Sequence, residues 1–232
     1  MKFRVFLLAL GLAGFSLAAD MLGEVTITPI HHGSLILQFG GKVIHIDPWS
    51  EGNYSSAPRA DYLLITDIHG DHLDKAMVDK LKKETTVVIA PAAVAKTILE
   101  AQVINNGEKK KFGDLEVEAV PMYNLQRGPQ PGALYHTKGR GNGYVLTLGG
   151  KRIYISGDTE AIPEMRALKN IDVAFVCMNL PYTMTPEEAA AGVKAFRPKV
   201  VYPYHYRGSD LKVFAAALAN EKGIEVRLRE WY

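Results

Sequence analysis

Between residues 66 and 73 the sequence reads Thr66-Asp67-Ile68-His69-Gly70-Asp71-His72-Leu73. Two imidazoles and two carboxylates therefore lie within six consecutive residues. The apolar run before them, residues 62–65, predicts a buried strand, and the helical spacing of apolar residues over 74–83 predicts a helix. Because Gly70 allows an irregular turn between the two, the four side chains can converge. The stretch predicts a metal site on a strand-to-helix loop that suits zinc, manganese or iron.

Each of these residues also has an ordinary structural role open to it. Asp71 or Asp74 is suited to cap the N-terminus of the following helix, and a single histidine in a loop is usually only solvated. Four metal-binding side chains at this spacing favour the metal site over those separate roles.

The first nineteen residues have the features of a secretory signal peptide. Lys2 and Arg4 give a positive start, residues 5–12 are apolar, and residues 16–19 are small enough for cleavage. The apolar run is too short for a comfortable membrane span. We therefore expect a signal peptide over 1–19, a single domain over 20–232, and an exported protein, periplasmic or secreted, without stable membrane insertion after cleavage.

Composition narrows the class of protein. A chain of 232 residues with 47% hydrophobic content is long enough for one substantial core. Removing Lys2 and Arg4 from the 27 basic residues leaves 25, equal to the 25 acidic residues. Such a balance lacks the basic stripe of a nucleic-acid binder, so we expect a small-molecule substrate and no nucleic acid; a homo-oligomer is compatible with the sequence. Cys177 lies in an apolar run and is expected to be a buried structural thiol.

The remaining pattern predicts the α/β class. Strands are expected over residues 25–29, 34–39, 42–46, 86–90, 115–121, 143–148, 152–156, 173–177, 200–203 and 225–228. Helices are expected over residues 92–101, 163–168, 185–196 and 210–220. A Gly-Gly pair at 40–41 predicts a hairpin, and no internal repeat is detectable. Residues 123–142 form a long polar, glycine-rich segment of the kind that is usually functional.

Polar, metal-competent side chains follow three separate strands. They are the residues of 67–72, Asp158 after the strand at 152–156, and His205 after the strand at 200–203. Loops at strand ends are where α/β scaffolds gather their sites. Taken singly, Asp158 could be a turn residue and His205 a stacked imidazole in a tyrosine-rich segment. Together with the metal loop they predict one constellation.

This order of motifs resembles the metallo-β-lactamase superfamily of metal-dependent hydrolases. The chain is most similar to its small single-domain branch, which includes the ascorbate-6-phosphate lactonases and the N-acyl-phosphatidylethanolamine phospholipase D group. The resemblance extends from Gly33-Ser34 through Ile46-Asp47-Pro48 to His205. It implies a four-layer αββα sandwich with one or two divalent metal ions at the edges of the sheets.

The resemblance also implies a role for individual residues. Asp71 and His72 match ligands of the second metal, which His205 completes. Asp158 matches the carboxylate that bridges both metals, and His69 matches a ligand of the first.

Two positions depart from the family pattern. Asp67 and Asn124 stand where the family has histidines of the first metal, so that this site is rich in oxygen. Oxygen ligands bind zinc less tightly and favour harder ions such as manganese or iron. We expect one firmly held metal, with zinc favoured, and a second that is weak, different or absent. His136 could replace the missing ligand, or equally bind substrate.

The expected chemistry is hydrolysis of an ester, lactone or phosphoester by a metal-activated water. Asp71 could accept the proton of that water. His136, Lys138 and Arg140 in the long loop could hold an anionic group or stabilise developing negative charge.

His32 and Tyr204 are expected to line the substrate pocket, and Asp47 to support a ligating imidazole. Within the enzyme class, a lactonase that degrades signalling lactones is the main rival to a phosphoesterase. A non-catalytic metal-binding or ligand-sensing protein is the alternative from another class, because the altered first site could have lost activity.

Overall fold

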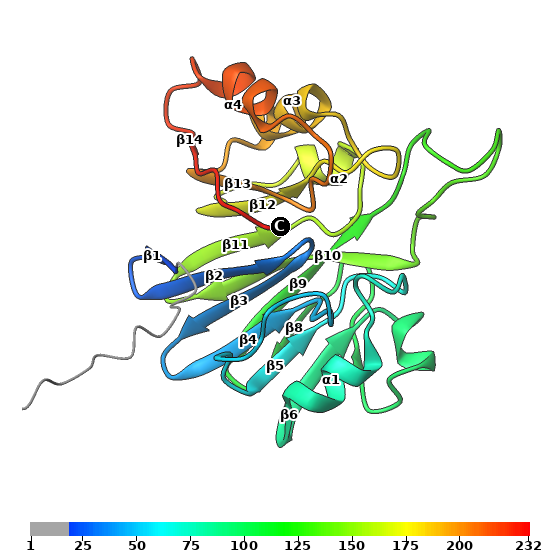
Figure 1. The fold of residues 1–232 in the computed structure, drawn as a ribbon, viewed down its shortest axis with the longest axis vertical. Helices are drawn as coiled ribbons and strands as arrows, with labels where there is room; N and C mark the ends of the chain where they lie inside the picture. Colours follow the sequence, from blue (N-terminus) through cyan, green and yellow to red (C-terminus); the bar gives the residue numbers. More distant parts are fainter. Residues whose placement is uncertain (1–18) are drawn as a thin grey trace, which may run out of the picture.

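The computed structural model describes residues 19–232, and within them the chain forms two seven-stranded sheets that pack face to face. In each sheet the first four strands along the chain pair antiparallel and the last four pair parallel. Figure 1 shows the two sheets in the middle of the molecule, the first from the N-terminal half and the second from the C-terminal half.

The first sheet is built, in order, from β1 (Asp20–Leu22), β2 (Val25–His31), β3 (Ser34–Phe39), β4 (Lys42–Ile46), β5 (Ala60–Leu64), β6 (Lys82–Ala90) and β7 (Gln102–Val103). The second is built from β8 (Lys109–Phe112), β9 (Leu115–Met122), β10 (Gly141–Leu148), β11 (Lys151–Ile155), β12 (Val173–Cys177), β13 (Val200–Tyr204) and β14 (Glu225–Val226). The hairpin expected at Gly40-Gly41 joins β3 to β4, and both glycines have the positive φ that its tight turn requires.

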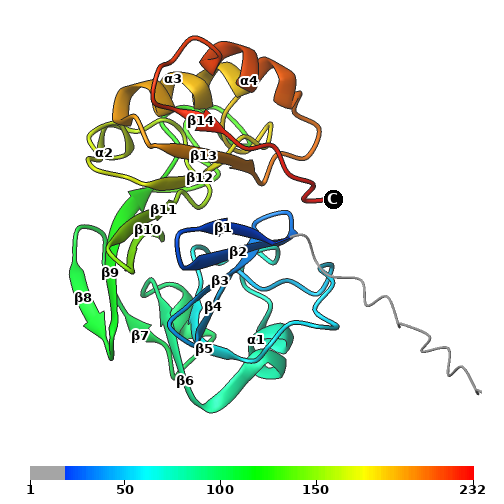
Figure 2. The same cartoon turned by 90° about the vertical axis from the view of Figure 1, so that its left-hand side faces the viewer.

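Helices cover the two outer faces. They are α1 (Lys75–Leu81), the 3₁₀ turn η1 (Val94–Lys96), α2 (Pro163–Arg166), α3 (Pro186–Phe196) and α4 (Leu211–Leu218). Figure 2 shows α1 outside the first sheet, and α3 and α4 outside the second. The expected four-layer αββα sandwich is therefore confirmed.

The strands that carry the centre are buried on both faces. Along β5, Tyr62 and Leu64 point into the main core between the sheets, whereas Leu63 belongs to a smaller cluster with Val78 of α1. Parallel strands covered on both sides read as continuous apolar runs for this reason. The strand ends are thereby fixed by packing on two sides, and the loops that follow start from a rigid base.

The prediction of a helix over residues 92–101 was wrong. This segment has only the single turn η1, and Leu99 is 84% exposed. The segment is rich in residues that favour helices, but Ala93 at the N-cap has no side-chain acceptor. The segment therefore lacks the capping hydrogen bond that would start a longer helix. The helix expected to reach residue 83 ends at Leu81, and β6 begins at once rather than at residue 86. Three strands that were not expected, β1, β7 and β8, are two to four residues long.

Most of the expected signal peptide, residues 1–18, lies outside the described residues. In the part of the chain that the structure describes, no helix is both long and apolar enough to cross a membrane.

Candidate metal centre

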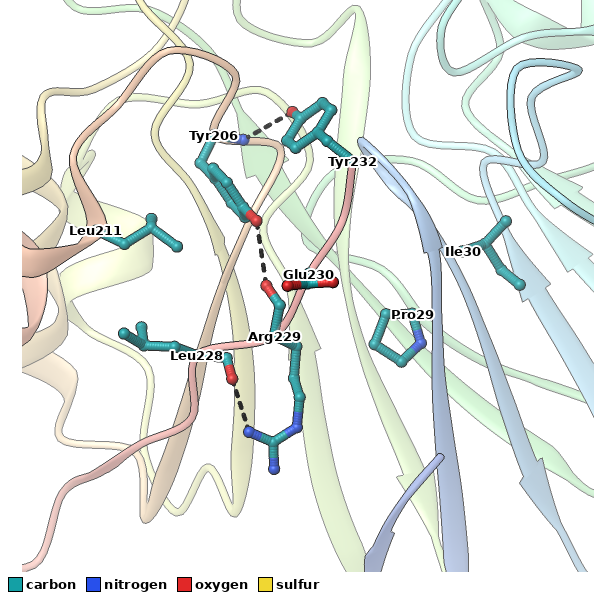
Figure 3. A pocket seen from close by; sticks show the side chains of 8 residues that line it. All are labelled: Pro29, Ile30, Tyr206, Leu211, Leu228, Arg229, Glu230 and Tyr232. Carbon is teal, nitrogen blue, oxygen red and sulfur yellow. Dashed lines mark hydrogen bonds between the residues drawn. The ribbon is translucent and has the colours of Figure 1, made fainter. Parts of the chain in front are cut away.

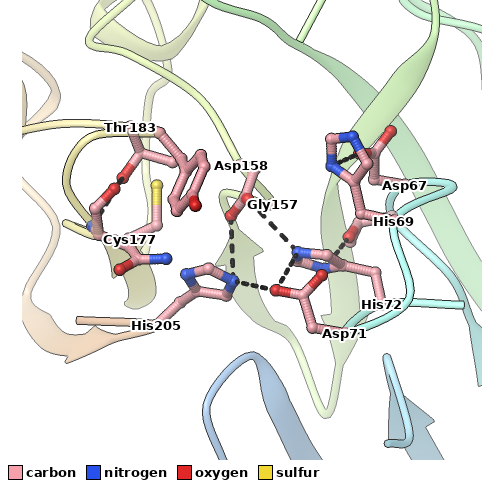
Figure 4. A network of polar contacts seen from close by, with 12 residues as sticks. Asp67, His69, Asp71, His72, Gly157, Asp158, Cys177, Thr183 and His205 are labelled. Carbon is pink, nitrogen blue, oxygen red and sulfur yellow. Dashed lines mark hydrogen bonds and ion pairs between the residues drawn. The ribbon is translucent and has the colours of Figure 1, made fainter. Parts of the chain in front are cut away.

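The expected metal ligands meet where loops of the two sheets face one another (Figure 4). Residues 67–72 follow β5 of the first sheet, whereas Asp158 follows β11 and His205 follows β13 of the second. His205 has a φ of 47°, a left-handed conformation that is unusual for a residue with a side chain. Strained backbone of this kind is concentrated at functional sites.

One cluster of ligand atoms is formed by His72, Asp158 and His205, all buried. The Nε2 atom of His72 lies 3.4 Å from one oxygen of Asp158, and the Nε2 atom of His205 lies 3.4 Å from the other. Asp71 completes the group, with its carboxylate 3.3 Å from His205 Nε2. Gly33 lies against both rings, because a Cβ there would be 3.0 Å from His205 and 3.4 Å from His72. Because Gly33 has no side chain, both imidazoles can lie against its backbone.

A second cluster contains Asp67, His69 and His136. His69 Nδ1 is 2.9 Å from the Asp67 carboxylate, and His136 Nε2 is 3.8 Å from the same oxygen. His136 Nε2 also lies 3.3 Å from the Asp158 oxygen that faces His72. Asp158 therefore stands between the two clusters, as a carboxylate shared by two metals would.

Hydrogen bonds from behind fix which nitrogen of His72 faces the centre. Its Nδ1 lies 2.8 Å from the Asp47 carboxylate and 3.0 Å from the Thr66 hydroxyl. Asp47 also accepts the backbone N–H of Thr66 at 2.7 Å. The carboxylate accepts from Nδ1–H, so Nε2 is the ring nitrogen that faces the centre and would bind a metal. Without a metal, burial opposes the charged ring, but the negative charges of Asp158, Asp71 and Asp47 raise the pKa of His72 well above its usual value. The expected support of an imidazole by Asp47 is confirmed.

His136 is held in the same way by Asn124. The amide oxygen of Asn124 accepts from the backbone N–H of His136 at 2.7 Å and from its Nδ1 at 2.8 Å. The amide nitrogen donates to the backbone carbonyl of Tyr182 at 2.8 Å. Asn124 is thus fully engaged, and the ring of His136 is directed with Nε2 toward the carboxylates.

His32 adds an imidazole that faces Asp71. Its Nε2 lies 3.1 Å from the Asp71 carboxylate, and the atoms of His32, Asp71 and His205 form a third possible ligand group. The Nδ1 atom is hydrogen bonded to the hydroxyl of Tyr232. Burial lowers the pKa of His32 to about 4, so the ring is neutral at pH 7.

The carboxylates of the centre are held in their ionised form. Burial on its own would raise the pKa of Asp158, but the charges of His205 and His72 hold it well below its usual range. Burial opposes ionisation of Asp71 as well, and the charge of His72 and a hydrogen bond from His205 lower its pKa. Buried negative charge with several imidazoles around it is the environment in which a divalent cation is stabilised.

The buried polar atoms provide a test of whether a metal fits. Within the described chain, His72 Nε2, His136 Nε2 and Asp158 Oδ1 are buried and make no hydrogen bond. Unpaired buried polar atoms are costly, and both of these imidazole nitrogens lie within 3.4 Å of the Asp158 carboxylate. Nitrogen and carboxylate donors of this kind fit zinc, manganese or iron.

The centre forms the floor of a cavity of about 560 Å³. Of the residues discussed so far, those that line it are His32, His69, Asp71, His136, Asp158 and Tyr182. The Asp71 side chain is 28% exposed, more than the carboxylates of Asp67 and Asp158. A small molecule in the cavity can therefore reach Asp71 and the more exposed His69, whose side chain is 44% exposed.

Comparisons with known proteins agree with this geometry. The family model described as the beta-lactamase superfamily domain matches residues 26–205. A UPF0173 metal-dependent hydrolase of Thermus thermophilus is 32% identical over 217 residues, 87% of this chain and 94% of the relative. The chain belongs to the metallo-β-lactamase superfamily. It is a metal-dependent hydrolase.

Solved structures support the same assignment. The hydrolase superposes with a TM-score of 0.87 on a protein from Parabacteroides distasonis whose structure was described as that of a metal-dependent hydrolase. The two are 42% identical, and the match covers 94% of this chain and 100% of the other. Igni18, a metallo hydrolase of Ignicoccus hospitalis, is 25% identical with a TM-score of 0.72, over 89% of this chain and 95% of the other. Curated relatives named as hydrolases favour an enzyme over the binding-protein alternative.

Four expected roles in the hydrolase need correction. Asn124 is not placed as a ligand, because its amide holds His136, which takes the position facing the carboxylates. Arg140 is not free for substrate, since its Nε and Nη2 donate to the two oxygens of Asp67 at 3.0 and 2.8 Å. Lys138 pairs with Glu164 at 2.6 Å, outside the cavity.

Tyr204 is the fourth correction. It is fully buried, and its hydroxyl accepts the backbone N–H of Gly157 at 3.0 Å. The side chain thus supports the turn that carries Asp158 instead of lining the pocket. The expected buried thiol is confirmed at Cys177, where burial raises the pKa to about 12.

The pairing of Arg140 with Asp67 adds a second reason to expect a weak first metal. Burial would raise the pKa of Asp67, but hydrogen bonds from His69 and Arg140 and the charge of His72 lower it to about 2. Because the guanidinium takes part of the carboxylate's negative charge, Asp67 is a weaker ligand than a free aspartate.

Sequence reasoning missed residues that are distant in the chain. Arg207 and Trp49 line the cavity, and Tyr232 supports His32. The available signal was position, because Trp49 follows β4 and Arg207 follows β13 on the side where Asp47 and His205 lie.

Proposed function

We propose that the protein hydrolyses a small molecule at an ester, lactone or phosphoester bond, with a water activated by one or two divalent metal ions. The observation that carries this proposal is the pair of ligand clusters that share Asp158 at the floor of an open cavity. Zinc is the favoured ion for the cluster of His72, Asp158 and His205, because two nitrogen donors and a carboxylate suit it.

A divalent metal held at this centre supplies a water of lowered pKa and a Lewis acid that polarises the substrate. The chain itself orients that site: Asp47 and Asn124 set the direction of two imidazoles from behind. Asp71 faces the cavity as an ionised carboxylate between His32 and His205, so it is placed to accept a proton from the attacking water. Of the other ligands, His72, His136, Asp158 and His205 are buried, whereas His69 is exposed.

The test compares Asp158→Asn with wild type after reconstitution with zinc, manganese or iron. Metal per chain is measured by elemental analysis. Turnover is measured separately with 4-nitrophenyl acetate, an acyl homoserine lactone and bis(4-nitrophenyl) phosphate. We expect one to two metal equivalents and turnover of at least one substrate in the wild type. The variant should lose at least ~100-fold in turnover, because loss of a group that only supports a ligand already costs ~10–100-fold.

Asp79→Asn is the matched control, since Asp79 is a surface carboxylate paired with Lys75 and Lys82. It should keep both metal and turnover. The proposal fails if metal-loaded wild type hydrolyses none of the three substrates, or if Asp158→Asn behaves like Asp79→Asn. Among the substrates, preference for the lactone over the phosphodiester separates the two enzyme classes expected above.

We also propose that the protein is exported by means of residues 1–19. The support is the positive start, short apolar run and small residues at 16–19. N-terminal sequencing of the protein from a bacterial periplasm should begin at Asp20, and an intact chain retained in the cytoplasm would contradict export.

A further inference from the structure

Part of the wall of the cavity is apolar and aromatic. Leu180 and Tyr182 both line the cavity and are each 45% exposed. Tyr182 packs edge-on against Tyr135, with ring centroids 5.0 Å apart, and Trp49 lines the cavity as well. Large exposed apolar side chains gathered at a concave site mark a surface that contacts a ligand. The body of the substrate is therefore expected to be apolar or aromatic.

One strongly basic side chain, Arg207, lines this cavity among the described residues. Within the described chain, no carboxylate lies within 4.0 Å of its guanidinium, and the guanidinium donates no hydrogen bond to another residue. The two basic side chains that the sequence suggested for substrate binding, Arg140 and Lys138, are paired with Asp67 and Glu164. Arg207 thus keeps all its donors for a ligand.

Tyr232 holds Arg207 at the mouth of the cavity. The guanidinium carbon lies 5.7 Å from the centre of the Tyr232 ring, a cation–π contact. The hydroxyl of Tyr232 is hydrogen bonded to His32 and accepts the backbone N–H of Tyr206 at 3.1 Å. Figure 3 shows Tyr206 and Tyr232 joined by this bond at the edge of a neighbouring cavity. The Tyr232 side chain therefore contacts both Arg207 and His32 of the metal centre.

We infer that the pocket recognises a substrate with one oxyanion, a carboxylate or its like, bound by Arg207, and an apolar body packed on the aromatic wall. A guanidinium binds such a group through two parallel hydrogen bonds. The anion is held at the mouth, and the bond to be cleaved can then lie over Asp71. This inference rests on the proposed function, because the oxyanion is assigned to the substrate of that site.

The test measures binding, so it does not depend on turnover. Isothermal titration calorimetry of the zinc-loaded protein compares naphthalene-2-sulfonate with methyl 2-naphthyl sulfone, which has the same body without the charge. We expect the wild type to bind the sulfonate about 10- to 100-fold more tightly, the range for a hydrogen bond to a charged group. Arg207→Gln should abolish that preference, and Arg207→Lys should restore part of it.

Lys138→Gln is the matched control and should keep the full preference, because Lys138 lies outside the cavity. Equal binding of the two probes by the wild type, no binding of either, or the same preference in Arg207→Gln would each overturn the inference. Loss of the preference in Lys138→Gln would overturn it as well, since it would assign the effect to general charge. Esterase activity of the same preparations is measured separately. Turnover without an Arg207-dependent preference rejects this inference alone, and absence of turnover rejects the proposed function alone.

Discussion

At the scale of single residues, the centre depends on groups that do not touch the metal position. Asp47 and Asn124 each accept a hydrogen bond from the Nδ1–H group of an imidazole, which leaves Nε2 of that ring directed inward. His32, Asp47 and His205 have φ values of 54°, 43° and 47°, in the left-handed region. Such conformations cost about 1 kcal/mol or more each, so the surrounding packing keeps these residues in place.

Asp47→Asn is predicted to weaken metal binding and leave the fold intact. Asparagine tolerates the left-handed backbone at this position, but its neutral amide lacks the carboxylate charge that makes the His72 ring a better ligand, and its NH2 group can also donate to Nδ1. We expect metal affinity to fall about 10- to 100-fold, measured by competition with a chelating dye. The control is Asp61→Asn. It removes a carboxylate that lies away from the centre and is hydrogen bonded to Val43 and Lys83. Unchanged affinity in Asp47→Asn would reject the support role.

The sequence predicted those site residues that directly follow strands. Asp158 and His205 are separated from β11 and β13 by at most two residues, so the strand pattern placed them. His136 and Asn124 lie in an irregular loop, where no periodicity sets which side chain turns inward. Their exchange of roles follows from the pairing of Asn124 N–H with the His136 carbonyl at 2.9 Å, a contact that spacing cannot reveal.

At the scale of elements, the reliable expectations were those with a packing or capping reason. The capping box of Thr185 and Glu188 is present at the start of α3, as its motif indicates. Residues 92–101 have helical composition but no cap, and they form only η1. Strands as short as β1 and β7 have no sequence period, because two or three residues cannot alternate. They are specified by the neighbouring strand that pairs with them.

The short strand β1 is tied to the second half through Asp20. Its carboxylate accepts from the Tyr202 hydroxyl at 2.8 Å and from Arg229 at 2.9 Å. Burial on its own would raise the pKa of Asp20, but these two hydrogen bonds and the charge of Arg229 lower it. A lowered pKa adds stability that is fully present above the unfolded value near 3.8 and is lost as the pH falls through the folded value.

Asp20→Asn is therefore predicted to destabilise the metal-free protein at pH 6 by about 1 kcal/mol. The difference from wild type should shrink below pH 3.8, where the wild-type carboxyl also becomes neutral. Urea unfolding across this range measures both. Glu24→Gln, at an exposed carboxylate without an ion pair in the described chain, should show no such difference. A constant difference at every pH would mean that the charge of Asp20 is not involved.

At the scale of the whole molecule, metal binding is predicted to stabilise the fold. Both ligand clusters take residues from both sheets: Asp67 and His72 come from the first, His136 and His205 from the second. Metal bound at 100 times its Kd adds ~2.7 kcal/mol. At ~2–4 °C per kcal/mol for a domain of this size, chelation should lower Tm by about 5–10 °C. Calorimetry with and without a chelator measures the shift.

His205→Ala is the control for that experiment, because its Tm should respond much less to the chelator. A wild-type Tm that neither chelation nor added zinc changes would contradict stabilisation through the centre. The α/β class was predictable from the order of strands and helices, and the four-layer sandwich from the resemblance to the superfamily. The matching pattern of the two sheets, three antiparallel pairs and then three parallel pairs, was not, because no sequence repeat accompanies it.

The two halves thus share a topology and divide the chemistry. Asp67, His69 and His72 belong to one half, and His136, Asp158 and His205 to the other. Neither half holds three ligands of the same cluster by itself. The centre exists only where the halves touch, as an active site shared by two subunits exists only in the dimer. A single chain that contains both halves makes that encounter intramolecular, so the site assembles independently of protein concentration.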